Sequence, residues 1–548
     1  MKKIARSVYL CLICGLILCA CSAGKGTITY EFTGDDAKKA GYAQGIITFE
    51  TKKPGMYQLY WSDEAGALNG YYEIAGLEIT EDKPKAQFEF GYHTAIPAGA
   101  TKIIAVEVPE ETEGDVTDLT VKKATGVYDI PAEKQLGYKQ EDALYTFNSY
   151  SDIHIDEEKW GEVPGYWWEY AELHWAQALQ YSVDKDVDFI ITSGDHINNA
   201  VNRNTDKEWK SYQYILASSD YVNPIYEASG NHEIKQAGML EEGLVNFILA
   251  TGLDSKKKTI QEWKPYYFIE EPGTGDLFIF MALEGGYRPA NDDEFSVEQI
   301  AWVEGLLKEN YGKGKNIYII EHANIAGYGP GDDTENPYYE GGMNTDLPSN
   351  AKFKAILEKY TDVIWISGHT HEDYALGYNY TNNNGNSCHM IHNSGVANPT
   401  HVTDGELDYA LEENLSQGYL VEVYEKAILF QGANICDKKI YPEFSYIIDG
   451  NTTASEIAEK TFRSDWAMTT GKARSVQANA KSVLGIYYEY SSYDTYQRLK
   501  KSYYKYVDAD VNTMSNEELS IMYDELGKGI KSLCELVEGV EIAALKKK

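Results

Sequence analysis

Positively charged residues are scarce in this chain. Its 548 residues include 49 lysines and arginines against 85 aspartates and glutamates, a formal net charge of −36. Proteins that bind nucleic acid polymers do so through basic surfaces that neutralise phosphates. The balance therefore argues against a nucleic acid polymer as partner. A small phosphorylated substrate remains compatible with it, because bound metal ions can reverse the local potential.

Cysteine is also scarce. Four of the seven cysteines lie within the first 21 residues, and only Cys388, Cys436 and Cys534 follow. Three widely spaced cysteines cannot form the framework of a disulfide-stabilised protein. At most one disulfide is open to them, and the spacing does not assign it.

Long apolar runs are missing, apart from one near the start. Val8 to Leu18 follows three basic residues and is too short to span a membrane, which is the layout of a secretory signal peptide. The next residues, Leu18-Cys19-Ala20-Cys21, resemble a bacterial lipobox, which implies cleavage before Cys21 and lipidation of Cys21. The alternative is an ordinary signal peptide with incidental cysteines. We expect an extracytoplasmic protein, lipid-anchored to a bacterial membrane at the cell surface or in the periplasm.

Common signatures of a protein nucleophile or of a phosphate-binding loop are absent as well. No Gly-x-Ser-x-Gly or Walker pattern occurs, and no internal repeat is visible. The length predicts two to four domains. The expected divisions are a signal peptide at 1–20, a tether at 21–26, an all-β domain at 27–140, an α/β domain at 141–450 and a helical region at 451–548.

Period-two alternation characterises the expected all-β domain. Tyr57, Leu59 and Trp61 alternate with other residues, as do Ile104 and Val106. Turn signals separate about seven such runs, which predicts a β-sandwich. We interpret it as an accessory module.

Strands alternate with helical stretches from about residue 141 to 450, which predicts a layered α/β domain. Helices are expected over Tyr166–Tyr181, Ser296–Glu309 and Ala351–Lys359. The last 98 residues contain no proline. Ser515 and Glu518 form a capping-box signature there. One helical face follows, made of Leu519, Met522, Leu526, Ile530, Leu533 and Val537.

Five short clusters of polar residues each follow an apolar, strand-like run. They are Asp152-Ile153-His154, Gly194-Asp195-His196, Gly230-Asn231-His232-Glu233, Glu321-His322 and Gly368-His369-Thr370-His371. In the first and last clusters the ligands are two residues apart, which on a strand would direct both side chains to one face. Ends of strands are where open α/β sheets place their sites. The clusters supply enough Asp, Asn and His side chains for two adjacent metal ions.

The order and spacing of these clusters resemble the calcineurin-like metallophosphoesterase family. Its pattern is Asp-x-His, Gly-Asp, Gly-Asn-His-Asp/Glu, a lone His and Gly-His-x-His, and the resemblance covers about residues 144–400. It implies a four-layer αββα sandwich. It also implies that Asp152, His154, Asp195 and His371 hold one metal, and that Asp195, Asn231, His322 and His369 hold the other.

Asp195 is thus the expected bridge between the metals, and His232 falls where the family keeps a histidine near the leaving group. There His232 would stabilise charge or deliver a proton. The mixed oxygen and nitrogen ligands suit Mn, Fe or Zn better than Ca or Mg. A hydroxide between the two metals would attack phosphorus in line.

Further residues are weaker candidates for substrate contact. His196, Asn198 and Asn324 adjoin ligands and would either contact substrate or support the ligands from behind. His392 and Asn393 end a strand that returns towards the site. The Gly-rich stretch from Tyr328 to Gly342 resembles a loop that covers a cleft.

Two departures narrow the branch of the family. Protein Ser/Thr phosphatases continue the Gly-Asp motif with an Asp and an Arg, whereas Asn198 and Asn199 stand here. Purple acid phosphatases also carry a β-sandwich but lack the first-motif histidine, whereas His154 is present. The expected function is hydrolysis of a small phosphomonoester or phosphodiester. The alternatives are a nucleotide-cleaving enzyme and an inactive surface-binding lipoprotein.

Overall fold

The structure is a computed structural model, and it consists of two compact units. Its description covers residues 26–68, 74–108, 119–156, 170–198, 205–234, 240–253, 264–282, 295–331, 342–374, 379–403, 406–409, 413–450 and parts of 480–536. One unit contains residues up to Tyr92 together with Gly99–Gly137. The other contains His93–Ala98 and everything from Tyr138 onwards. The chain thus changes units near residue 138.

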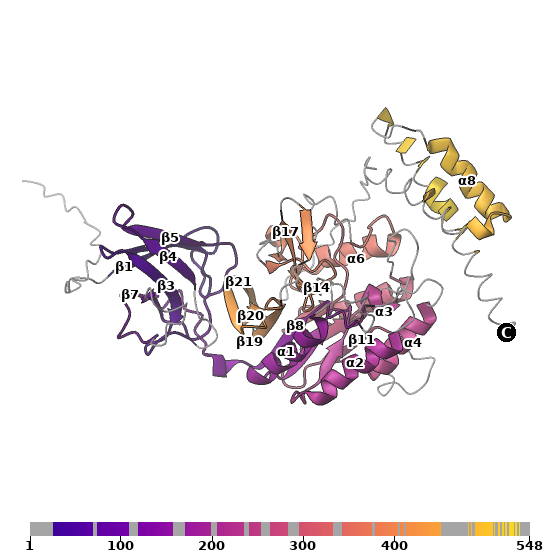
Figure 1. The fold of residues 1–548 in the computed structure, drawn as a ribbon. Coiled ribbons are helices and arrows are strands. Elements are labelled where there is room, and N and C mark those ends of the chain that lie inside the picture. The colour runs from indigo at the N-terminus through magenta and orange to yellow at the C-terminus, as the bar shows by residue number, and fades with distance from the viewer. Residues whose placement is uncertain are drawn as a thin grey trace, which may run out of the picture. The chain divides into compact units, whose positions relative to one another are not determined.

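The first unit is a sandwich of two antiparallel sheets (Figure 1). One sheet has the order β1-β2-β5 and the other β4-β3-β6-β7. Trp61 stacks on Phe90 with ring centroids 5.5 Å apart, so side chains of the two sheets meet in one core. The predicted all-β sandwich is confirmed. Its strands are β1 (Thr27–Phe32), β2 (Gly45–Glu50), β3 (Gly55–Ser62), β4 (Ala75–Ile79), β5 (Lys85–Phe90), β6 (Lys102–Val108) and β7 (Gly126–Asp129).

Six residues from within the sandwich sequence belong to the second unit. Thr94 forms a β-bridge with Tyr446, and the His93 carbonyl accepts the Ile447 N–H at 3.0 Å. The segment therefore extends the sheet that ends in β21. Nothing in the alternation pattern predicted this exchange.

The second unit contains two six-stranded mixed sheets. The first has the order β10-β9-β8-β19-β20-β21, with β8, β9 and β10 parallel. The second has the order β11-β12-β13-β14-β16-β15, with β12, β13, β14 and β16 parallel. The first sheet's strands are β8 (Tyr145–Tyr150), β9 (Phe189–Thr192), β10 (Ile225–Glu227), β19 (Gln417–Val423), β20 (Ala427–Asn434) and β21 (Lys439–Asp449). Those of the second are β11 (Tyr267–Glu270), β12 (Leu277–Phe280), β13 (Ile317–Ile320), β14 (Ile364–Ser367), β15 (Tyr380–Thr381) and β16 (His389–His392).

The two sheets face each other, and helices cover their outer faces. Phe147 of β8 meets Phe278 of β12 edge-on at 5.5 Å between ring centroids. On the outer side of the first sheet, Trp175 of α1 (Ala171–Asp184) packs on Tyr150 and stacks on Tyr212 of α2 (Thr205–Ser218). Helices α5 (Val297–Asn310) and α6 (Pro348–Lys359) share a core with the second sheet. The order helix, sheet, sheet, helix confirms the predicted four-layer α/β sandwich.

Helices α5 and α6 lie within three residues of the bounds expected from the sequence. Helix α1 ends three residues later than expected, and the first four residues of its expected range, 166–169, lie outside the described residues. Ser296 caps α5, and its hydroxyl accepts the Gln299 N–H at 3.1 Å. Short helices α3 (Asn231–Ile234) and α4 (Leu240–Ala250) follow β10. A small hairpin of β17 (Thr400–Thr403) and β18 (Glu406–Tyr409) follows β16.

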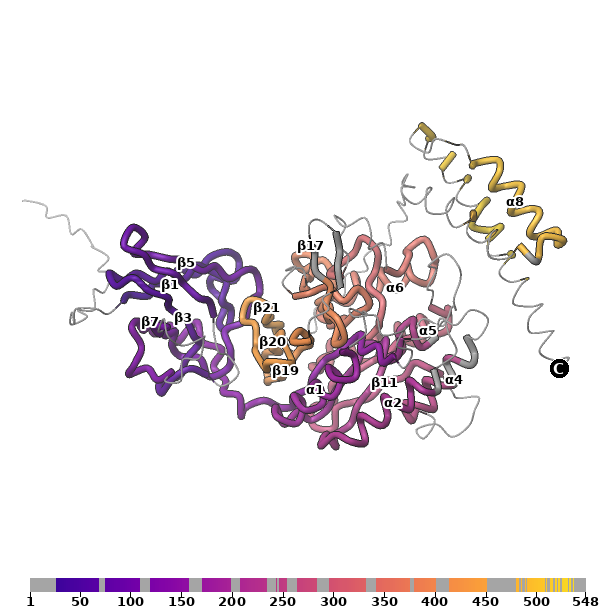
Figure 2. The backbone as a smooth tube through the Cα atoms, in the orientation of Figure 1, coloured from indigo at the N-terminus to yellow at the C-terminus, as the bar shows by residue number. Residues whose placement is uncertain are grey.

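The C-terminal region has a hydrophobic cluster of its own. Tyr496 and Leu499 of α8 (Asp494–Tyr506) pack with Leu519, Leu526 and other buried residues between 480 and 533. Figure 2 shows α8 beside short helical pieces of the same colour range. The capping box is confirmed, because Ser515 and Glu518 exchange hydrogen bonds.

Several sequence-based predictions lie outside the described residues. These are the signal peptide and Cys21, Asn199, Cys534, Val537 and most of the Gly-rich stretch after Gly331. Cys388 and Cys436 are free thiols. In the part of the chain that the structure describes, no helix combines the length and apolarity needed to cross a bilayer.

Candidate metal centre

The five clusters converge at one edge of the two facing sheets. Each follows the carboxyl end of a strand, namely β8, β9, β10, β13 or β14. Parallel strands end at the same edge, which is why residues far apart in sequence meet there. Three groups of side chains come within ligand distance of one another. They are Asp152–His154–His371, His154–Asp195–His232 and Asp195–His322–His369.

One sequence argument about these ligands was wrong. Asp152 and His154 were expected on a strand, facing the same way, but β8 ends at Tyr150. Both residues have left-handed backbones, with φ of 56° and 49°. His369 and His371 follow the end of β14 in the same way, with φ of 82° and 58°. The side chains share a direction because the loops turn sharply, and not because a strand alternates.

The first group is compact. Asp152 Oδ1 lies 3.1 Å from His371 Nε2 and 3.6 Å from His154 Nε2. The two Nε2 atoms of these histidines are 3.0 Å apart. The other oxygen of Asp152 accepts the His369 N–H at 3.0 Å, which fixes the carboxylate.

The second group centres on His322. Its Nε2 atom lies 3.0 Å from Asp195 Oδ2, 3.1 Å from Asn231 Oδ1 and 3.2 Å from His369 Nδ1. Asp195 Oδ2 is also 3.7 Å from His154 Nε2 of the first group. Asp195 therefore lies between the groups, at the position expected for a bridging ligand.

The donor chemistry of both groups fits cations. Nδ1 of His322 lies 3.0 Å from the Ser193 carbonyl, and Nδ1 of His371 lies 3.2 Å from that of Asn398. A carbonyl only accepts, so each Nδ1 carries the hydrogen, and each ring with an unprotonated Nε2 directs that lone pair into the centre. There the lone pairs face carboxylate and amide oxygens. Such an array of acceptors is stable only around protons or metal ions.

The electrostatics of the centre support the same conclusion. Burial alone would lower the pKa of His322, but the adjacent carboxylates, Asp195 first, raise it to about 10. Burial would raise the pKa of Asp195, yet the surrounding histidines hold it well below its usual range. The centre thus binds positive charge strongly. It is the position for which the ligand pattern of the sequence predicted two divalent ions.

Glycines allow the ligand loops to approach this closely. A Cβ on Gly194 would lie 2.6 Å from the Gly230 nitrogen and 2.8 Å from His322 Nδ1. A Cβ on Gly230 would overlap the Asp195 carboxylate. The φ of Gly194 is 117°, a conformation that L side chains rarely adopt.

His232 borders the centre and keeps 29 % of its side chain exposed. Its Nδ1 donates to the Asn198 carbonyl at 2.5 Å, which leaves Nε2 as the acceptor of the neutral ring. Its ring lies perpendicular to that of His154, 4.6 Å away. Its Nε2 lies 3.9 Å from Asp195 Oδ2, so the histidine borders the ligand cluster through that atom.

The weaker candidates lie around the ligands rather than between them. His196 is fully buried and hydrogen-bonds Thr192, while Asn198 donates to Asp156. Asn324 donates to the Gly331 carbonyl. His392 bonds Ser367 and Thr370, and Asn393 bonds Ser149 and Ser193. These contacts hold ligand loops in place, and substrate contact by these residues stays a prediction. Supporting residues that the sequence did not reveal include Asn398 and Asp156.

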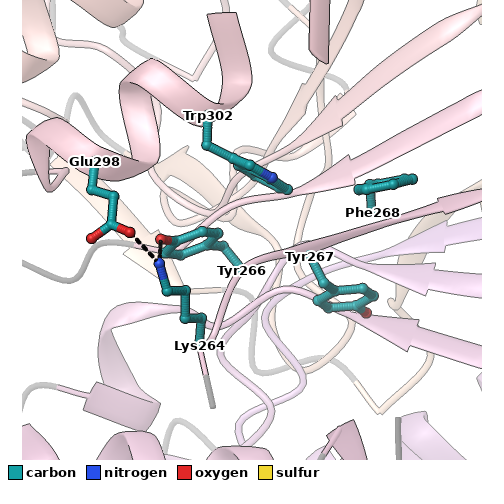
Figure 3. A pocket seen from close by; sticks show the side chains of 6 residues that line it. All are labelled: Lys264, Tyr266, Tyr267, Phe268, Glu298 and Trp302. Carbon is teal, nitrogen blue, oxygen red and sulfur yellow. Dashed lines mark hydrogen bonds and ion pairs between the residues drawn. The ribbon is translucent and has the colours of Figure 1, made fainter. Parts of the chain in front are cut away.

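A hollow of about 260 Å³ lies at β11 and α5 and contains none of the ligands. Figure 3 shows Lys264 between Glu298 and Tyr266, with Trp302 above them. The Lys264 ammonium is 2.5 Å from Glu298 and donates to the Tyr266 hydroxyl at 2.8 Å. The polar groups of this hollow thus bind one another.

Residues 147–373 match the calcineurin-like phosphoesterase family. Solved structures with a similar fold include a dimetal phosphatase from Danio rerio, at 12% identity over 56% of this chain and 100% of that one, with a TM-score of 0.41. A purple acid phosphatase from yellow lupin (Lupinus luteus) seeds shares 13% identity over 74% of this chain and 72% of its own, with a TM-score of 0.37. A putative 5'-nucleotidase from Staphylococcus aureus shares 12% identity over 57% of this chain and 54% of its own, with a TM-score of 0.31. Curated proteins yielded no match.

The family match spans the first ligand, Asp152, through the last, His371. Within it lie all the residues of the two ligand groups, carried by the four-layer fold on which they converge. The match of residues 147–373 to the calcineurin-like phosphoesterase family, together with the ligand groups within them, identifies the protein as a dinuclear-metal phosphoesterase.

Proposed function

We propose that the protein hydrolyses a small phosphomonoester or phosphodiester outside the cytoplasm. The observation that carries this proposal is the position of Asp195 between two ligand groups, with the partly exposed His232 beside them. When bound, two divalent ions supply an activated water and positive charge for the phosphoryl oxygens. Mn, Fe or Zn is the proposed metal, because the ligands combine oxygen and nitrogen.

The chain's own residues have separate tasks in this proposal. Asp195 holds the two ligand groups in register, since its other oxygen accepts the His232 N–H at 2.8 Å. His232 receives or delivers a proton at Nε2, because its Nδ1–H is held by the Asn198 carbonyl. The leaving group would therefore depart on the side of His232.

Hydrolysis of paired chromogenic monoester and diester substrates tests this proposal. Purified protein should hydrolyse substrate with added Mn and lose this activity with chelator. Asp195→Ala should be inactive in both conditions. Equal turnover in every preparation, or none with any metal, would refute the dinuclear hydrolase. The ratio of monoester to diester turnover assigns the subclass.

A nucleotide-cleaving enzyme is the second candidate. Such an enzyme commonly stacks a base between two aromatic rings. The aromatic side chains of the hollow in Figure 3 do not offer that space, because Tyr266 and Trp302 touch each other with centroids 4.9 Å apart and planes tilted by 49°. An inactive binding lipoprotein, by contrast, is disfavoured by the full ligand set.

The proposed location rests on the N-terminal sequence, with its apolar run and Cys21. Lipidation of Cys21 would retain the mature protein at a bacterial membrane. Cell fractionation of a Cys21→Ser variant tests this point. The variant should appear as soluble protein, or as precursor of higher mass that keeps its signal peptide, whereas membrane retention at the mature mass would contradict lipidation at that residue.

A further inference from the structure

Glu233 directly follows His232 and is assigned to neither ligand group. Its side chain is almost fully buried. Its carboxylate accepts four backbone N–H groups, those of Asp195 at 3.0 Å, His196 at 2.6 Å, Ile197 at 3.3 Å and Gly230 at 2.6 Å. Few carboxylates receive so many backbone donors, and hydrogen bonds to a charged acceptor are the strong ones.

These donors come from two different loops. Three belong to the loop that follows β9 and carries Asp195. The fourth, Gly230, precedes Asn231 in the loop that follows β10. One oxygen, Oε2, receives both the Asp195 and the Gly230 N–H, so the two loops share a single acceptor atom. Glu233 therefore ties the loop of the bridging ligand to the loop of the amide ligand.

A negative charge at this position lies beside the buried carboxylate of Asp195. Burial and repulsion from Asp195 oppose ionisation of Glu233, but the contact with His196 and the bond from the Gly230 N–H outweigh them and hold the pKa of the Glu233 carboxyl below its usual value. A glutamine would avoid this repulsion, but it has only one acceptor oxygen, and its amide group would meet N–H donors. The two acceptor oxygens of a carboxylate are what the four N–H groups require.

We propose that Glu233 is a positioning residue that sets the separation of Asp195 from Asn231 and thereby the affinity for the second metal. This inference rests on the proposed function, because it concerns the same centre. Asn231 belongs only to the second group, whereas Asp152, His154 and His371 of the first group come from loops after β8 and β14. Loss of Glu233 should therefore weaken the second metal much more than the first.

The first test uses metal-free protein and needs no activity. Hydrogen exchange of the amides of 195–197 and 230 should be slow in the unaltered protein. In Glu233→Gln it should accelerate about tenfold or more, as expected when charge-assisted hydrogen bonds are lost. Glu422→Gln, a buried carboxylate of β19 outside the centre, serves as the matched control and should leave these amides protected.

The second test is a Mn²⁺ titration followed by electron paramagnetic resonance. The unaltered protein and Glu422→Gln should give the spin-coupled signal of two neighbouring ions. Glu233→Gln should give an isolated-ion signal at one equivalent and recover the coupled signal only at about 10–100-fold more metal, the usual cost of losing a residue that orients ligands. Glu233→Asp, which keeps the charge on a shorter side chain, should fall in between and replaces Glu233→Gln if that variant does not fold.

The outcomes separate the two claims. Unchanged exchange in Glu233→Gln, or equal weakening of both metals, would overturn the role of Glu233 while leaving the dinuclear hydrolase intact. Fewer than two ions bound by the unaltered protein would refute the proposed function, and the metal-positioning role of Glu233 with it.

Discussion

Five of the predicted ligands have left-handed backbones. Asp152, His154, Asp195, His369 and His371 all have φ between 49° and 82°. Such conformations cost free energy in residues other than glycine and persist where the surroundings enforce them. Among the described residues only five others that are not glycine share this feature. Strain in this protein is therefore concentrated where the ligands converge.

Gly230 offers a direct test of that close packing. A methyl group there would overlap the carboxylate of Asp195 and lie 2.5 Å from its backbone nitrogen. We expect Gly230→Ala to abolish hydrolysis, to weaken metal binding and to destabilise the protein by about 1–3 kcal/mol. Activity assays, a Mn²⁺ titration and thermal melts measure these three effects.

Gly305→Ala is the matched control. Gly305 is exposed in the middle of α5, and a Cβ there would meet no atom within 4 Å. Alanine in a helix interior is favoured over glycine by about 0.5–1 kcal/mol. The variant should be at least as stable as the unaltered protein and fully active. Normal metal binding by Gly230→Ala would contradict the packing described here.

At the scale of residues, the sequence predicted which side chains meet at the centre. It did not predict the backbone conformations that bring them together. The ligands could be recognised in the sequence because each Asp, Asn or His follows an apolar run at the end of a strand. The left-handed turns at Asp152 and His154 were not visible, since alternation along a strand explained the spacing equally well. The Glu233 contacts were hidden too, because backbone donors leave no residue-type signal.

At the scale of elements, strands and helices were well predicted where one face is buried. The capping residue Ser296 predicted the start of α5, and the alternation of Leu59 and Trp61 predicted β3. The pairing of β19 with β8 was not predictable, because it joins residues about 270 positions apart. The use of His93–Ala98 by the second unit was missed for the same reason.

Glu422 of β19 yields a prediction about pH. Burial raises the pKa of its carboxyl, although the hydrogen bond from Tyr424, the nearby Gln431 and the charge of Lys185 oppose this. The folded state therefore binds the proton more tightly than the unfolded chain, and stability falls as pH rises from the ordinary carboxyl pKa to the raised value. Glu422→Gln should lack this fall and melt a few degrees higher at neutral pH.

Thermal melts across acidic to neutral pH measure the effect. Glu309→Gln, an exposed carboxylate of α5, is the control and should melt like the unaltered protein at every pH. A Glu422→Gln variant that melts lower at neutral pH would show that the charge is stabilising, contrary to the stated sign.

At the scale of the whole molecule, the C-terminal region has a core distinct from that of the catalytic domain. Leu526 is fully buried in that core, whose members all lie between residues 480 and 533. Leu526→Ala should cost this region about 2–5 kcal/mol and expose it to protease. Phosphoester hydrolysis should persist, because no ligand belongs to the region.

Ile521→Ala is the control for that experiment, since Ile521 is 53% exposed. It should leave protease resistance unchanged. Loss of hydrolysis in Leu526→Ala with the catalytic domain still folded would show that the C-terminal helices contribute to the site.

The five ligand loops together are expected to hold two metal ions around Asp195. Elemental analysis of protein equilibrated with Mn²⁺ and freed of excess metal tests this expectation most directly. The unaltered protein should hold two ions per chain, and Asp195→Ala at most one. One ion or none in the unaltered protein, or two in both, would contradict it.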